Sequence, residues 1–390
     1  MNVAIVSAEA PVNVGGLAAY QRMLAFGLSE KFGIAGTFMC LRMARRKLRG
    51  EPVLPWPVRL IGSMRWGRMH GCMMHLASRR MFHAMLEKLS CAALPSQRLS
   101  RAAAGVGAMH FVGTGWDFLG FPVKAAASRI GAKFTILPAV HPLSWGDDAI
   151  DIRLYRKADR VFCLSDYEKC HLAKRGVPEE KLIRCGLPPM CRNDGDGRRF
   201  RIGIEIAERP AVLFIGRRDK GKGYPALLDA WTLVVKQVPD AVLVLAGPGD
   251  SDPVRLAAIP SDSVRDLGIP DELEKANALA ATDVFCLPSA HESFGIVYLE
   301  AWFYGKPVIC GTAPASRELV REGETGLWSD GSPASIAAGI VALLGNGALR
   351  NRLGEAGRTL QQSEYTRDSA LATHVASFGM ADNEPCAFRV

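Results

Sequence analysis

Short runs of Val, Ile, Leu and Phe recur along the chain, and longer stretches with helical character separate them. Each run is four to seven residues long and is expected to form a buried strand: residues 3–7, 108–112, 134–140, 161–165, 211–215, 241–246, 284–288 and 307–310. Continuous apolar strands with helices between them are typical of parallel sheets that are covered on both faces. The pattern therefore predicts an α/β fold built from doubly wound βαβ units.

The length of 390 residues suggests about two domains, at roughly 100–200 residues per domain. Residues 186–210 lie between two groups of predicted strands, are polar and rich in Gly and Pro, and are interpreted as a linker. We therefore predict an N-terminal domain over residues 1–188 and a C-terminal domain over 189–360. Residues 361–390 are predicted to form a helix and a tail, with the option of packing back on the N-terminal domain.

The net charge of +9 is concentrated in one stretch. Residues 40–105 contain thirteen Lys and Arg but only two acids, which gives +11, so the rest of the chain carries −2. A general nucleic-acid binder would need a basic face on a recognisable reading module, and no such module is seen. The hydrophobic content of 48% excludes global disorder.

Nothing in the sequence indicates export or a membrane span. No apolar run approaches the roughly 18 residues that a transmembrane helix needs. The first residues lack the basic start and long apolar core of a secretory signal. Ten cysteines are scattered without a Cys-x-x-Cys pair, so we expect reduced thiols in the cytoplasm.

The most informative segment follows the predicted strand at residues 284–288. A loop containing Glu292 leads into a helix that is expected to start near Phe294 or Gly295 and to carry Glu300. A helix N-terminus offers free N–H groups to a phosphate, and carboxylates accept hydrogen bonds from pairs of sugar hydroxyls. The segment therefore favours a nucleotide-sugar site. The alternative is that Glu292 is an ordinary acid at a helix start and Glu300 is solvated.

Three other places suit the same chemistry. Arg217 and Lys222 follow the predicted strand at 211–215 and could neutralise a diphosphate, or could form an ordinary basic turn. Gly15 and Gly16 precede a predicted helix and suit a phosphate or sugar, or a simple tight turn. His141 ends a predicted strand and is expected to face a cleft, unless its role is structural.

These motifs together resemble the retaining GT-B glycosyltransferases of family four, also called glycosyltransferase group 1. The family's E-x7-E signature matches ESFGIVYLEA at residues 292–301, followed by GKPV at 305–308. The resemblance extends over most of the chain and includes GR at 216–217, KG at 222–223, LVLAGPG at 243–249, ADR at 158–160, ELV at 318–320, Gly323 and TG at 325–326. The resemblance implies two Rossmann-like domains that face each other across a cleft.

The resemblance also implies roles for single residues. Glu300 would bind the donor ribose, and Arg217 with Lys222 would bind the donor phosphates. Glu292 and His141 would act at the donor sugar near the reaction centre and are taken as the catalytic residues. The remaining donor-binding positions would be Gly15, Gly16, Phe294, Gly295, Ile296 and Val297, the last four through backbone amides.

The implied reaction moves a sugar, with retention, from a nucleotide-diphosphate sugar to an acceptor hydroxyl. No cofactor beyond that co-substrate is expected. No metal is expected either, because Arg217 and Lys222 supply the positive charge that Asp-x-Asp pairs such as Asp250 and Asp252 would otherwise recruit. We expect a role in cell-surface polysaccharide or glycolipid synthesis. The alternatives are an inactive GT-B protein that binds a glycan or partner, and a GT-B phosphorylase or epimerase.

The basic stretch at 40–105 falls where this family faces its acceptor. It mixes cations with Met and aromatic residues, a composition that suits anionic lipid headgroups. We therefore expect a glycan or lipid-linked acceptor, no nucleic acid, and a cytoplasmic protein that can sit at the inner face of the membrane. The alternative for this stretch is a solvated basic helix packed on the N-terminal domain.

Overall fold

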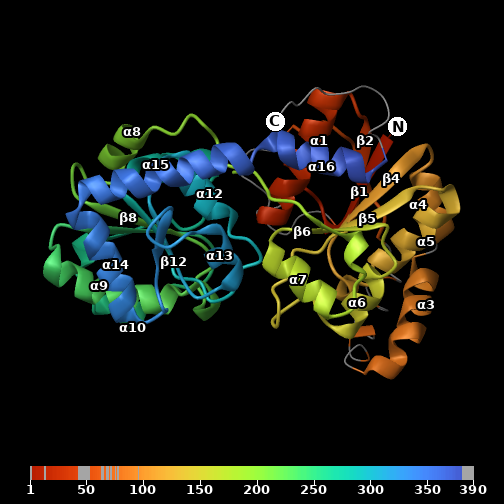
Figure 1. Cartoon of the computed structure of the whole chain (residues 1–390), viewed down its shortest axis with the longest axis horizontal. Coiled ribbons are helices and arrows are strands. Elements are labelled where there is room, and N and C mark those ends of the chain that lie inside the picture. Colours follow the sequence, from red (N-terminus) through yellow and green to blue (C-terminus); the bar gives the residue numbers. More distant parts are fainter. Residues whose placement is uncertain are drawn as a thin grey trace. The chain divides into compact units, whose positions relative to one another are not determined.

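The computed structural model describes residues 2–12, 15–42, 53–62, 66, 70, 73–74, 76, 79–94 and 96–379. It divides into two compact units (Figure 1). The first comprises Met1–Leu187 and Arg367–Val390, and the second comprises Pro188–Thr366. The division thus falls one residue before the predicted boundary at 188. The second unit ends six residues beyond the predicted position 360, because a long helix runs on to Glu364.

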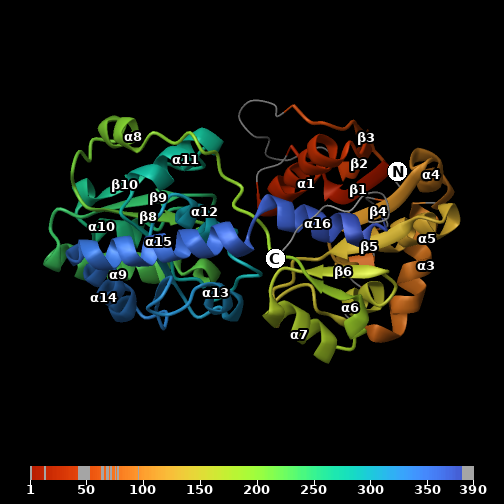
Figure 2. The ribbon, with the colours of Figure 1, turned by 45° about the horizontal axis from the view of Figure 1, so that its top comes forward.

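The described residues of the first unit form a seven-stranded parallel sheet in the order β3-β2-β1-β4-β5-β6-β7. Its strands are β1 Asn2–Glu9, β2 Gly36–Arg42, β3 Val58–Leu60, β4 Val106–Val112, β5 Lys133–Leu137, β6 Arg160–Cys163 and β7 Leu182–Arg184. Its helices are α1 Gly16–Phe32, α3 His83–Ala93, α4 Ser96–Ala102, α5 Gly120–Ile130, α6 Ala149–Tyr155, α7 Asp166–Lys174 and α16 Arg367–Ser377. These helices lie on both sides of the sheet (Figure 2).

The second unit contains a six-stranded parallel sheet in the order β10-β9-β8-β11-β12-β13. Its strands are β8 Ala211–Ile215, β9 Val242–Ala246, β10 Val264–Asp266, β11 Val284–Leu287, β12 Val308–Cys310 and β13 Gly326–Trp328. Its helices are α8 Gly197–Gly203, α9 Tyr224–Gln237, α10 Pro253–Ala257, α11 Glu272–Ala281, α12 Ile296–Phe303, α13 Pro314–Leu319, α14 Pro333–Gly345 and α15 Gly347–Glu364. Both sheets follow the doubly wound α/β pattern, so the predicted fold class is confirmed.

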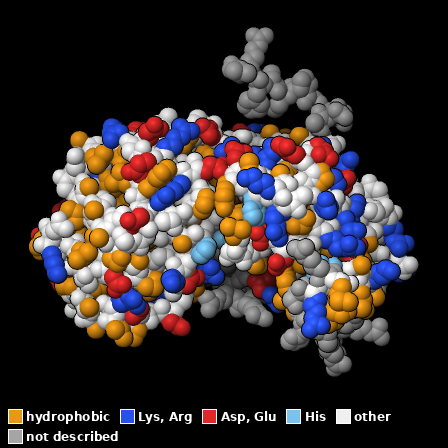
Figure 3. Space-filling view, turned by 60° about the horizontal axis from the view of Figure 1, so that its bottom comes forward, with side chains coloured by type: hydrophobic (Ala, Val, Ile, Leu, Met, Phe, Trp, Pro, Cys, Tyr) orange, Lys and Arg blue, Asp and Glu red, His pale blue; other side chains and the backbone are white. Residues whose placement is uncertain are grey.

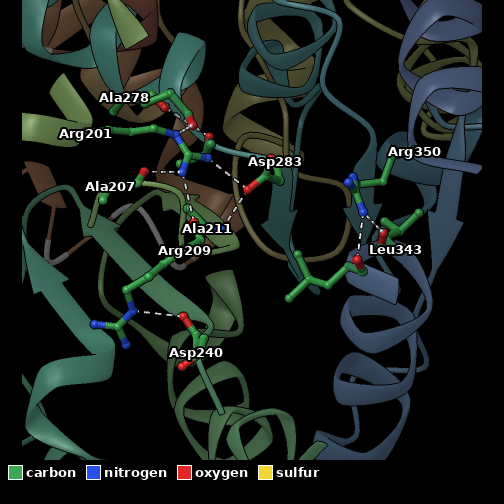
Figure 4. Close-up of polar contacts among 12 residues, drawn as sticks. Arg201, Ala207, Arg209, Ala211, Asp240, Ala278, Asp283, Leu343 and Arg350 are labelled. Carbon is green, nitrogen blue, oxygen red and sulfur yellow. Dashed lines mark hydrogen bonds and ion pairs between the residues drawn. The ribbon is translucent and has the colours of Figure 1, made fainter. Parts of the chain in front are cut away.

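Two local predictions are wrong. The strand predicted over 134–140 ends at Leu137, because Ala139 adopts a φ of 50° and the chain turns there. The linker predicted over 186–210 contains helix α8, whose N-cap Asp196 accepts a hydrogen bond from the backbone N–H of Arg199. Helix α8 is held to the second unit through Arg201, which pairs with Asp283 and donates to the carbonyls of Ala207 and Arg209 (Figure 4).

No single helix in the described part of the chain is both long enough and apolar enough to cross a bilayer. Helix α14 and the helical stretch Gly347–Ser377 pass that test only as a pair, which is bent by 103°.

The C-terminal helix α16 is joined to the first sheet by a buried chain of hydrogen bonds. Tyr20 Oη lies 2.7 Å from His110 Nε2 and 2.6 Å from His374 Nε2, and His110 Nδ1 lies 2.8 Å from Thr135 Oγ1. His374 Nδ1 lies 2.7 Å from the carbonyl of Ala370, which can only accept. His374 therefore carries its proton on Nδ1 and accepts from Tyr20, so both histidines can be satisfied while neutral. Burial lowers the pKa of His374 to about 4 and also lowers that of His110.

The buried hydrogen bonds of His374 predict that the attachment of α16 to the first sheet weakens in acid. An unfolded His has a pKa of about 6.5, so between that value and about 4 the unfolded state binds the proton at His374 more readily than the folded state does. The stability from this group is complete above about pH 6.5 and is lost as pH falls toward 4, by about 3 kcal/mol in total. Hydrogen exchange of residues 367–377 and denaturant unfolding at several pH values measure it.

The matched variants are His374→Phe, which keeps the ring stacked on Phe162, and His291→Asn at an exposed position. His374→Phe should reduce the pH dependence between 4 and 6.5 and leave the part that comes from His110, whereas His291→Asn should leave it unchanged. An equal slope in all three proteins would contradict the assignment of the buried proton site to His374.

Candidate functional site

Two loops of the second unit are brought together because β8 and β11 are adjacent parallel strands. The loop after β8 carries Arg217 and Lys222, and the loop after β11 carries Glu292. The carbonyl of Gly221 joins the loops by accepting from the backbone N–H groups of Ala290 and His291, at 2.9 and 3.2 Å, and from Ser289 Oγ at 3.0 Å. The two segments singled out in the sequence therefore form one backbone-linked site.

Glycine is required at two turning points of this site. Gly223 has a φ of 73°, and a Cβ there would lie 2.2 Å from the carbonyl oxygen of Pro288. Gly295 has a φ of 87°, and its Cβ would lie 2.6 Å from the ring of Tyr298. Both conformations are left-handed, so a side chain would add strain and a steric clash at once. The first glycine lets the two loops approach, and the second starts helix α12.

Lys222 and Glu292 form an ion pair at the centre of the site. Lys222 Nζ lies 2.6 Å from Glu292 Oε1 and also donates to the carbonyl of His291 at 3.2 Å. The side chains are only 14% and 8% exposed, so both charges are largely withdrawn from water. An ammonium group has three donors, and these contacts use two of them. The third donor can bind a further acceptor, such as a phosphate oxygen.

Arg217 occupies the open side of the same loop. Its side chain is 68% exposed, and its Nε lies 3.3 Å from a carboxylate oxygen of Asp219. Asp219 also accepts from the backbone N–H of Lys222 at 2.9 Å, which fixes the turn. Arg217 therefore lies five residues from Lys222 with its guanidinium open to solvent, in a position to meet an arriving anion.

Glu300 lies inside α12 and is 2% exposed. Its Oε1 accepts from Lys275 Nζ at 3.0 Å, and Lys275 also pairs with Glu272 at 3.2 Å. Burial favours a neutral Lys275, but the two carboxylates outweigh it and raise the pKa of Lys275, so it stays charged. The second oxygen of Glu300, Oε2, has no hydrogen-bond partner among the described residues. A buried carboxylate oxygen without a donor is costly, and a ligand hydroxyl would satisfy it.

The first turn of α12 presents its backbone to the same region. Gly295 is the N-cap, and no side chain caps the helix. Phe294 is buried against Tyr365, with ring centroids 5.7 Å apart, while Ile296 and Val297 are half-buried. Uncapped N–H groups at a helix start can bind an anion. The predicted positions 294–297 thus form one turn next to the Lys222–Glu292 pair.

Two of the three predicted residues of the first unit, Gly15 and Gly16, line a cavity of about 410 Å³. Gly15 and Gly16 line it at the start of α1, and Gly15 has a φ of 138° with open space where a side chain would be. His141 is half-buried in the turn after β5, and its ring centroid lies 6.3 Å from that of Trp145, which lines the cavity. Gly15 and Gly16 therefore share this cavity with Trp145 of the His141 turn, and His141 itself is not part of its lining.

Several charged residues of these sites were missed by sequence reasoning. Lys275 is the partner of Glu300, and the only local signal is its spacing of three residues from Glu272, with which it also pairs on α11. In the first unit, the missed residues are Glu9 and Arg42, which form a 2.8 Å ion pair on the cavity wall. Asp117, which follows the predicted strand at 108–112, lines the same cavity and is a position that the sequence does indicate for acceptor contact. Burial raises the pKa of Asp117 above its ordinary value.

The Asp-x-Asp strings have structural partners. Asp194 pairs with Arg192, Asp196 caps α8, and Asp252 caps α10 and pairs with Arg255. Across the residues that the structure describes, no group of three or more His, Cys, Asp or Glu side chains is arranged to hold a metal ion.

Two doubly wound parallel-sheet units in one chain are typical of the GT-B glycosyltransferase folds. The structure superposes on Anabaena HepE, solved in complex with UDP, with a TM-score of 0.74 over 97% of this chain and 100% of that one, at 14% identity. At that identity the likeness concerns the fold, and it confirms the GT-B architecture.

The chain belongs to the glycosyl transferases group 1 family. The family model matches residues 198–360. A GDP-mannose-dependent alpha-(1-6)-phosphatidylinositol monomannoside mannosyltransferase of Mycolicibacterium smegmatis is 31% identical over 278 residues, which cover 64% of this chain and 72% of that protein. The phosphatidyl-myo-inositol mannosyltransferase of Mycobacterium tuberculosis is 40% identical over 154 residues, and the match spans 37% of this chain and 41% of that relative.

The Lys222–Glu292 pair predicts strong energetic coupling between the two loops. Lys222→Met leaves the Glu292 carboxylate nearly buried without its cation and should lower the free energy of unfolding by about 3 kcal/mol. The double variant Lys222→Met/Glu292→Gln should lose less than the sum of the single variants, with a coupling of about 1–3 kcal/mol. Denaturant unfolding of the four proteins measures this cycle.

Arg217→Met is the matched control, because this exposed cation belongs to the same loop and should change stability by no more than about 0.5 kcal/mol. Additive effects of Lys222→Met and Glu292→Gln would contradict the pairing.

Proposed function

We propose that this chain is a glycosyltransferase that moves a sugar from a nucleotide-diphosphate donor to an acceptor hydroxyl with retention at the anomeric carbon. The observation that carries the proposal is the buried Oε2 of Glu300, which has no hydrogen-bond donor among the described residues. The helix that carries Glu300 has an uncapped N-terminus, and the loop just before that helix is paired with the cation Lys222. A ribose hydroxyl would supply the missing donor to Glu300. The diphosphate would meet Arg217, Lys222 and the amides of residues 294–297.

The proposed chemistry depends on stabilisation of the negative charge of the leaving group by the second unit. A departing nucleoside diphosphate develops charge that fixed cations and amides can stabilise by several kcal/mol. The free donor of Lys222 and the exposed guanidinium of Arg217 supply that charge without a metal ion. Glu292 orients Lys222 and would contact the donor sugar, while Gly15, Gly16 and His141 would act from the first unit. The leaving phosphate itself would take the acceptor proton.

We further propose a lipid-linked or glycan acceptor, in glycolipid or cell-surface polysaccharide synthesis. Support comes from two relatives whose names specify phosphatidylinositol-based acceptors. The basic stretch 40–105 would contact anionic lipid at the cytoplasmic face of the membrane. Several of its cations, including Arg45, Arg46 and Lys47, lie outside the described residues. Among the described residues of this stretch, the apolar side chains of Met81 and Met85 are 79% and 41% exposed.

The donor role of Glu300 is tested by Glu300→Gln, which keeps the shape of the side chain and removes its charge. Charge-assisted hydrogen bonds contribute about 1.5–3 kcal/mol, so kcat/KM for the donor should fall about 10- to 100-fold. The assay is turnover of a panel of UDP-, GDP- and ADP-sugars, with product configuration followed by NMR. Calorimetry of the matching nucleoside diphosphate gives the change in binding separately.

The matched control is Glu355→Gln, an exposed carboxylate on α15 that should leave turnover unchanged. Full donor turnover by Glu300→Gln would overturn the site assignment, and failure to use any donor would overturn the proposed activity. Cleavage that requires inorganic phosphate would instead identify a phosphorylase.

A further inference from the structure

A second concentration of positive charge lies in the first unit, outside the stretch that the composition singled out. Helices α6 and α7 and the residues that follow each of them contribute five cations to one cavity of about 720 Å³: Arg153, Arg156, Lys157, Lys174 and Arg175. No acidic side chain lines that cavity among the described residues. Figure 3 views the molecule from the side on which Figure 1 places α3, α6 and α7, and there Lys and Arg lie beside hydrophobic side chains.

One carboxylate compensates part of this charge. Glu87 of α3 accepts from Arg153 Nε at 2.7 Å and pairs with Lys157 Nζ at 3.0 Å. Burial acts to raise the pKa of Glu87, but the hydrogen bonds from the two cations hold it below its ordinary value. Glu87 therefore remains ionised and fixes one wall of the cavity.

The other three cations have no acidic partner in the described part of the chain. Arg156 Nε donates to the carbonyl of Gly176 at 2.6 Å, and an Nη of Arg175 donates to the carbonyl of Asp147 at 2.7 Å. The first bond lies just beyond the C-terminus of α7, where cations are favourable, and the second joins the residue after α7 to the residue before the N-cap of α6. Each guanidinium has five N–H donors, however, so most of the donors stay available for a ligand. Because a carbonyl group is neutral, its hydrogen bond does not cancel the positive charge of the guanidinium.

The cavity also has an apolar side. Met81, Ala84, Ala149 and Ile152 line it together with the cations. The side chain of Met81 is 79% exposed, an unusual position for a large apolar group. A ligand that fits both surfaces carries a phosphate for the guanidinium and ammonium groups and a hydrocarbon part for Met81 and Ile152.

We propose that this cavity is a binding site for the phosphate group of an amphiphilic or organic phosphate, separate from the donor site of the second unit. Arg156, Lys174 and Arg175 contact the phosphate, Arg153 and Lys157 add long-range attraction, and the Met81 side contacts the adjoining carbon chain. Phospholipid headgroups and soluble phosphates share this chemistry. Binding here does not depend on the proposed transfer reaction, so each can fail without the other.

The test uses the full chain and a local readout. Hydrogen exchange of peptides covering residues 149–157 and 166–175 is followed with sodium pyrophosphate, and separately with phosphatidylcholine vesicles with and without phosphatidylglycerol. The test variant is Arg156→Gln/Lys174→Gln, which removes two positive charges, and the matched control is Lys169→Glu, which changes the net charge by the same two units on α7 outside the cavity. The apparent Kd should rise about tenfold in the test variant and stay within about twofold in the control.

Protection by pyrophosphate alone identifies a soluble phosphate, protection by the anionic vesicles alone identifies a lipid headgroup, and either result supports the site if the test variant weakens it. Equal protection in the wild type and the test variant, or no protection by either probe, overturns it. Thermal unfolding establishes that the variant is folded. If it is not, Lys174→Gln carries the same test, because that exposed side chain makes no hydrogen bond or ion pair with a described residue.

Discussion

Parallel pairing of β8 with β11 is the constraint on which the candidate donor site depends. Val212 lies opposite Val284 and Leu213 opposite Phe285, so the two strands end at the same edge of the sheet. Side chains about seventy residues apart in the chain can then meet, as Lys222 and Glu292 do. The carbonyl of Gly221, which accepts three hydrogen bonds from the second loop, converts this proximity into fixed geometry. Without that strand order, the loops that carry Lys222 and Glu292 would not be adjacent and the ion pair could not form.

The sequence allows the sheets and part of this site to be predicted for definite physical reasons. Buried parallel strands must be apolar on both faces, so strands such as β8 and β9 stand out as uninterrupted runs. Glu292 stands out because it follows such a strand just before a helix, and Glu300 stands out because it lies eight residues further on, inside that helix. Lys275 could not be found in the same way. Its partner Glu300 is on another helix, 25 residues further along the chain, and only the tertiary fold brings the two side chains together.

Polar residues with distant partners account for the other differences. The segment around α8 is polar and glycine-rich, so it resembles a linker until Arg201 is seen to bind Asp283 and three backbone carbonyls from its neighbours. In the same way, His374 is an unremarkable residue in a helix near the chain end. It becomes a buried part of the first unit only through Tyr20, more than 350 residues earlier. Contacts of such long sequence separation leave no local periodicity to detect.

The two basic regions differ in how their charge is balanced, and we expect this difference to decide which anions each of them binds. Lys222 and Lys275 are each held by carboxylates, so the donor side offers directed hydrogen bonds rather than excess charge. An anion that binds there must fit the one free donor of Lys222, the guanidinium of Arg217 and the amides of α12. That requirement favours a ligand of defined shape, such as a diphosphate. In the cavity of α6 and α7, three cations lack a carboxylate partner among the described residues. We therefore expect the net positive charge of this cavity, more than the exact shape of the ligand, to determine how strongly an anion binds there. Such a surface attracts anions of many shapes and acts over a longer range.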